Sequence, residues 1–102
     1  MRFSTKGIYM TRDVQAYLEE GKLQHSEILE SVERHFCNLG HECEQDNKMN
    51  EHAIKNNYGR VFSVFNICNH RIYIITDGLH LANDPVHGGT YPMTTILFPD
   101  EY

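Results

Sequence analysis

The first half of the chain carries hydrophobic residues at the spacing of amphipathic helices. Thr11 suits a helix N-cap and Gly21 suits a helix end. Between them the apolar residues repeat at i, i+3 and i+4, at Val14, Tyr17 and Leu18. A second helix is predicted to begin near Ser26 and to stop at Gly40. Its apolar face consists of Ile28, Leu29, Val32, Phe36 and Leu39.

The second half changes to the alternating pattern of β-strands. Residues 60–68 and 71–76 are predicted to be two strands of a hairpin, joined by a two-residue turn at Asn69-His70. A last strand is predicted over residues 93–98, because Pro99 then halts the pairing. The chain thus places helix periodicity first and strand periodicity second.

The segments between these elements are polar and less regular. Residues 41–46 are interpreted as a short polar edge strand, and residues 46–57 as a loop or one weak helical turn. Without a β-α-β alternation, the order of elements predicts an α+β fold. We expect two helices packed on one face of an antiparallel sheet of three to five strands, in a single domain over residues 1–102.

Charge is distributed unevenly along the chain, whose net charge is -5. Residues 13–46 hold nine acidic residues against Lys22 and Arg34, so this segment alone is strongly negative. Such a surface repels phosphate backbones, and we expect no nucleic-acid partner but a protein with a basic surface. The candidate contact residues are Glu19, Glu20, Glu27, Glu30 and Glu33. The alternative is that these glutamates form only the solvated face of the helices.

Three features bear on location. The N-terminal residues 1–7 lack the apolar region of a signal peptide, and no stretch approaches the ~18 apolar residues of a membrane span. An odd number of cysteines, three, is typical of reduced thiols rather than a disulfide framework. We therefore expect a cytoplasmic protein with no membrane partner.

Histidine and cysteine fall in close pairs, and these residue types are the ligands that zinc prefers. His35 and Cys37 lie about 200° apart around the second helix and are excluded as joint ligands. The remaining set is His41, Cys43, Cys68 and His70. This set can bind one metal ion only if one strand runs through His41 and Cys43 and another through Cys68 and His70. The predicted turn at Asn69-His70 is incompatible with the second strand, and Cys68 is then a small buried apolar residue.

No catalytic motif accompanies these residues. The cysteines lack a nucleophile signature, His87-Gly88-Gly89 has no G-x-S-x-G elbow to serve, and phosphate-binding glycine loops are absent. Glu51-His52, with Asp46 nearby, is a candidate acid/base pair in a polar loop, although adjacent residues of an extended chain point apart. The sequence favours a non-enzymatic protein.

The C-terminal half resembles a family of small uncharacterised bacterial proteins carried on plasmids, phages and conjugative elements. The resemblance rests on short motifs: Asp46-Asn47, Glu51-His52, Gly59-Arg60-Val61-Phe62, Asp84-Pro85 and the ending Thr95-Ile96-Leu97-Phe98-Pro99-Asp100-Glu101-Tyr102, with a weaker likeness over residues 7–15. The chain departs from the pattern at Ala53, where aspartate is usual, and at Ser63, where tryptophan is usual. The resemblance implies a mobile-element accessory protein and no established activity.

Three hypotheses follow. The first is an accessory protein that binds a host or element protein through its acidic helical face, for example by occupying the basic channel of a host defence nuclease. The second is a zinc-binding protein or metal-dependent enzyme that uses the His/Cys set, with no other cofactor expected. The third is a homodimer paired through the C-terminal strand or the 41–46 edge strand.

Overall fold

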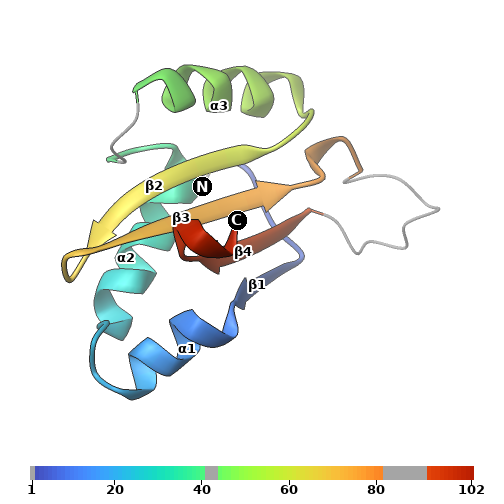
Figure 1. Ribbon diagram of the computed structural model, residues 1–102. Coiled ribbons are helices and arrows are strands. Elements are labelled where there is room, and N and C mark those ends of the chain that lie inside the picture. The colour runs from blue at the N-terminus through green and yellow to red at the C-terminus, as the bar shows by residue number, and fades with distance from the viewer. Residues whose placement is uncertain (1, 41–43, 82–91) are drawn as a thin grey trace.

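The structure is a computed structural model that describes residues 2–40, 44–81 and 92–102. Its helices and strands follow one another along the chain as β1 (Gly7–Met10), α1 (Arg12–Glu19), α2 (His25–Cys37), α3 (Glu44–Asn56), β2 (Val61–Ile67), β3 (His70–Asp77), the 3₁₀ turn η1 (Leu79–Leu81), β4 (Met93–Leu97) and the 3₁₀ turn η3 (Pro99–Glu101). The α+β class is confirmed (Figure 1).

Four strands form one sheet in the order β1-β4-β3-β2. β2 pairs with β3 and β3 with β4 in antiparallel fashion, but β1 runs parallel to β4. The prediction of a purely antiparallel sheet is therefore wrong. A parallel neighbour requires a crossover connection, and here the chain passes through α1, α2, α3 and the β2–β3 hairpin before β4 returns beside β1.

The two predicted helices are confirmed, with small differences at their ends. The Thr11 side chain caps α1 by accepting a hydrogen bond from the Val14 backbone N–H. α2 ends at Cys37, before the expected Gly40, because Asn38 adopts the left-handed conformation of a helix C-cap. The apolar sides of both helices pack on the same sheet face, with Val14, Leu18, Ile28, Val32 and Phe36 in one cluster with strand residues.

A third helix, α3, replaces the predicted loop, and it also contradicts the edge strand at residues 44–46. The sequence of α3 is strongly polar, so its hydrophobic pattern is weak. Contacts with other elements stabilise this helix. Ala53 packs on Val61 and Leu79, and the buried Asn50 side chain forms hydrogen bonds with the β2 backbone. Figure 1 shows α3 alongside β2, at the sheet edge away from α1. Residues 41–43 lie outside the described residues.

The hairpin is confirmed, but its turn lies one residue earlier than predicted. Cys68 and Asn69 both have positive φ, of 52° and 66°, and Ile67 pairs with His70. Two left-handed residues in a two-residue loop match the right-handed twist of the flanking strands. His70 is therefore the first residue of β3 and not part of the turn.

A chain of hydrogen bonds crosses the interior from α2 to the segment before β1. His35 is fully buried, and its Nδ1 lies 2.7 Å from Ser63 Oγ while its Nε2 lies 2.8 Å from Thr76 Oγ1. Thr76 Oγ1 lies 2.7 Å from Thr94 Oγ1, which donates to Thr5 Oγ1 at 2.9 Å. The Thr5 hydroxyl in turn donates to backbone carbonyls.

The hydrogen bond from Thr5 to the backbone determines which group is the donor in every other hydrogen bond of this series. A carbonyl only accepts, so Thr5 donates to it, Thr94 donates to Thr5 and Thr76 donates to Thr94. Thr76 then accepts from the imidazole, and the chain is satisfied by the tautomer of His35 that carries its proton on Nε2 and accepts from Ser63 at Nδ1. Each hydroxyl in this series of hydrogen bonds has a partner.

Replacement of His35 by alanine is expected to destabilise the fold by about 3 to 5 kcal/mol, because it opens a cavity and removes a partner from two buried hydroxyls. Urea unfolding followed by circular dichroism measures this. Glu33→Ala, at an exposed position of the same helix, is the control and should change the unfolding free energy by no more than about 0.5 kcal/mol. A loss below about 1 kcal/mol for His35→Ala would contradict the role assigned to the chain.

Candidate binding surfaces

The predicted contact glutamates all lie on the solvent side of α1 and α2 or just after α1, and all five are exposed. Two of them form ion pairs close to their own positions in the chain: Glu20 with Lys22 at 2.9 Å, and Glu30 with Arg34 at 2.6 Å. Exposed pairs of this kind contribute little to stability. These pairs reduce the net negative charge of the face and leave Glu19, Glu27 and Glu33 as its remaining predicted contact acids.

A hollow of about 470 Å³ lies where α2 meets the β2–β3 turn. Glu27, Glu30, Ser31 and Arg34 line it from α2, and Asn66, Ile67, Cys68 and Asn69 line it from the hairpin. The structure therefore brings two of the predicted glutamates to one concave site. The hairpin wall of this site could not be foreseen from the helix pattern.

The Cys68 thiol forms a hydrogen bond within this hollow. Its Sγ donates to a Glu27 carboxylate oxygen at 2.9 Å, and this hydrogen bond, followed by desolvation, raises the pKa of Cys68 above its ordinary value. A thiol held in its protonated form is a poor nucleophile and a poor metal ligand. The hydrogen bond joins the β2–β3 turn to α2.

The predicted metal set is only partly described. Cys68 lies in the turn, whereas His70 begins β3 and packs edge-on against Tyr17 and Phe98, so the strand that was to carry both residues does not run through them. His41 and Cys43 lie outside the described residues. Within residues 2–40, 44–81 and 92–102, no group of three potential ligands is close enough to hold a metal ion. The zinc site stays a prediction.

The two side chains of the candidate acid/base pair, Glu51 and His52, contact different partners. Glu51 forms an ion pair with Arg2 through two contacts, one of them at 2.7 Å, and also accepts from Asn38 at 3.0 Å. These hydrogen bonds from Arg2 and Asn38 lower the pKa of Glu51 to about 2. His52 instead faces Asn56, which donates to its backbone carbonyl. Glu51 thus ties the N-terminal segment to α3.

The two departures from the resembled family are buried positions. Ala53 packs in the α3–β2 contact, and Ser63 is fully buried under His35. An aspartate or a tryptophan would not fit these environments without rearrangement. In this chain Ala53 serves packing and Ser63 serves the hydrogen bond to His35.

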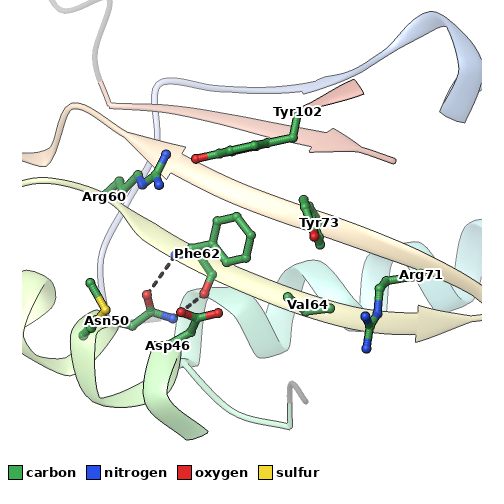
Figure 2. A pocket seen from close by; sticks show the side chains of 9 residues that line it. Asp46, Asn50, Arg60, Phe62, Val64, Arg71, Tyr73 and Tyr102 are labelled. Atoms are coloured by element: carbon green, nitrogen blue, oxygen red, sulfur yellow. Dashed lines mark hydrogen bonds between the residues drawn. The ribbon is translucent and has the colours of Figure 1, made fainter. Parts of the chain in front are cut away.

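A second cavity, which the sequence patterns did not indicate, lies between α3 and the sheet face that α1 and α2 leave uncovered. Its volume is about 580 Å³. Figure 2 shows the nine residues that line it: Asp46, Met49 and Asn50 from α3, Arg60, Phe62, Val64, Arg71 and Tyr73 from or beside β2 and β3, and Tyr102. The signal was present in the strand alternation, because residues 62, 64, 71 and 73 share the face opposite to the core.

The proposed dimer edges also change. β4 lies between β1 and β3, so the C-terminal strand has no free edge. The two outer strands are β1 and β2, and Asn50 pairs with β2 at Phe62. β1 carries exposed apolar side chains, with Ile8 49% and Tyr9 54% exposed. Among the described strands, β1 is the edge that a second copy could extend, and a homodimer stays a prediction.

Comparisons with models of protein families, with curated protein sequences and with solved structures found no match to this chain. Among the described residues, the helices are too short and too polar to cross a membrane. The resemblance to the mobile-element family therefore stays a prediction.

Glu51 is expected to make stability depend on acid pH. The pKa of Glu51 is lowered in the folded state. Its contribution to the free energy of unfolding is therefore present above the ordinary glutamate pKa of about 4.5 and is lost as pH falls toward about 2. Thermal unfolding between pH 6 and pH 2 should show the wild type melting above Glu51→Gln at pH 6, with the difference in melting temperature shrinking toward pH 2. A difference in melting temperature that stays constant over this range would show that the carboxylate charge is not responsible.

Proposed function

We propose that this protein is a non-enzymatic accessory protein that binds a partner with a basic surface through the acidic face of α1 and α2, formed by Glu19, Glu20, Glu27, Glu30 and Glu33. The observation that supports this is the hollow between α2 and the β2–β3 turn. Glu27 and Glu30 both line it, beside the side-chain amides of Asn66 and Asn69. Carboxylates and amide carbonyls together suit the guanidinium or ammonium group of a partner.

Arg34 shows how such a group would be held. Its Nη2 donates to Glu30 Oε1 at 2.6 Å, at the rim of the hollow. An incoming arginine competes with Arg34 for this carboxylate, so the gain per contact is small and the attraction is mainly electrostatic. Attraction of this kind raises the association rate and weakens with salt.

An apolar contact lies next to the charges. Leu29 is 65% exposed and stands one turn before Glu33 on α2. An exposed apolar side chain beside acidic ones resembles the composition of a protein interface, in which an apolar centre is bordered by polar residues. The face thus offers both attraction and a place for close packing.

The form of action we propose is inhibition of a host defence protein by occupation of a basic nucleic-acid channel. The mobile-element context comes from the resemblance, and the charge of the face supplies the physical reason. A channel that binds polyphosphate presents arginine and lysine side chains, which are the groups that the acidic face attracts.

The proposal is tested by capture from a lysate of a bacterial host at low salt, with the double variant Glu27→Gln/Glu30→Gln. Asp77→Asn/Asp100→Asn is the matched control, because it removes the same charge at exposed acids away from the face. The glutamate variant should lose a basic partner that the control retains, and salt raised to about 0.5 M should release it.

Binding is also measured directly by NMR titration with an arginine-rich peptide. Shifts should concentrate on α2 and the β2–β3 turn, and Arg34→Gln, which removes the internal competitor, should tighten binding severalfold. Equal loss of binding in both double variants would mean that net charge alone matters and would contradict a defined surface. A partner that ignores salt would also contradict the proposal.

A further inference from the structure

The cavity of Figure 2 lies on the opposite side of the sheet from α2 and is independent of the acidic face. Its floor is aromatic: the Phe62 and Tyr73 rings are 4.8 Å apart between centroids, and Tyr102 stands edge-on to both, at 5.9 Å and 6.0 Å. Phe62 and Tyr73 are half-buried, whereas Tyr102 is 61% exposed. Edge-to-face rings leave π-faces available to a further planar group.

Arg60 stands at one end of this floor. Its guanidinium carbon lies 5.5 Å from the centroid of the Tyr102 ring and 5.8 Å from that of Phe62. Within the described part of the chain, the Arg60 side chain has no carboxylate within ion-pair distance. At these distances the rings attract the guanidinium through cation–π contacts, and its N–H donors match the two oxygens of a carboxylate.

Other polar residues that line the cavity affect where an anion can bind. The Asn50 amide is occupied, because Nδ2 donates to the Phe62 carbonyl and to Asn38, while Oδ1 accepts from the Phe62 N–H. Asp46 projects from α3, on the wall opposite Tyr102 (Figure 2). Arg71, the second arginine of the lining, already has another interaction partner, as Asp46 does. We therefore assign the anion to the Arg60 end of the cavity and an uncharged ring to its middle.

Size and charge narrow the ligand further. A volume of about 580 Å³ falls in the range of sites for small organic molecules. The planar guanidinium of Arg60 matches the two oxygens of a carboxylate, whereas phosphate sites usually add several backbone N–H donors.

We propose that this cavity binds a small aromatic carboxylate, whose ring lies against Phe62, Tyr73 and Tyr102 and whose carboxylate is bound by Arg60. Binding here would give the protein a small-molecule ligand in addition to a protein partner. The two surfaces lie on opposite sides of the sheet, so the failure of one proposal leaves the other standing.

The test is an NMR titration of the full chain with indole-3-acetate and 4-hydroxyphenylacetate, each paired with its neutral amide. Shifts are expected at Met49, Phe62, Tyr73 and Tyr102, with the amides about tenfold weaker because they lack the charge-assisted hydrogen bond. AMP and adenosine form the nucleotide arm of the titration. Tighter binding of AMP than of either carboxylate would overturn the proposal.

Variants assign the effect to the cavity. Arg60→Gln should weaken carboxylate binding about tenfold, because it removes the charged donor of the proposed hydrogen bonds. Arg12→Gln removes an exposed arginine from α1 and should leave the affinity unchanged. Unchanged affinity in Arg60→Gln, equal binding of acid and amide, or the absence of shifts at the cavity residues with both carboxylates would overturn the proposal. Thermal melting of each variant confirms that the fold is retained.

Discussion

The hydrogen-bond chain centred on His35 is the constraint on which the rest of this structure depends. It joins α2, β2, β3, β4 and the segment before β1 through side chains that are buried between layers. Polar groups in such a place are costly unless every one has a partner. The sheet therefore has one favourable register, in which Ser63, Thr76 and Thr94 all face the helices, because a slip of one residue turns them to the other face.

The same alternation creates the cavity. With Ser63 and Phe65 directed toward α2, the residues between and before them, Phe62 and Val64, must face the opposite side. Asn50 then joins α3 to the edge of β2 by replacing the backbone pair that another strand would supply. One asparagine thus limits strand addition at this edge and places the α3 wall beside the aromatic floor.

Much of the fold could be predicted from the sequence, because Val14 and Leu18, Ile28 and Val32, and the 61–67 strand follow regular periods. α3 could not, since Asn50 and Ala53 bury only against a strand that comes later in the chain, and tertiary contacts override a weak local pattern. The parallel pairing of β1 was hidden for a similar reason: four residues carry no sign of the direction of their partner. Of the candidate sites, the acidic helix face could be predicted from the spacing of the glutamates along the helices. The cavity could be recognised only once the register of the strands was known.

The two proposed surfaces differ in what governs them. On the acidic face many exposed charges act together, so salt controls the attraction. In the cavity the Arg60 guanidinium acts at contact distance, whereas the glutamates of α2 lie on the other side of the sheet (Figure 1). The general spacing between packed layers is about 10 Å. That distance is comparable with the Debye length at physiological salt, about 8 Å, so the negative face only weakly opposes an anion on the other side. A protein of net negative charge can therefore hold an anionic ligand, provided that contact geometry at Arg60, rather than overall charge, supplies the binding energy.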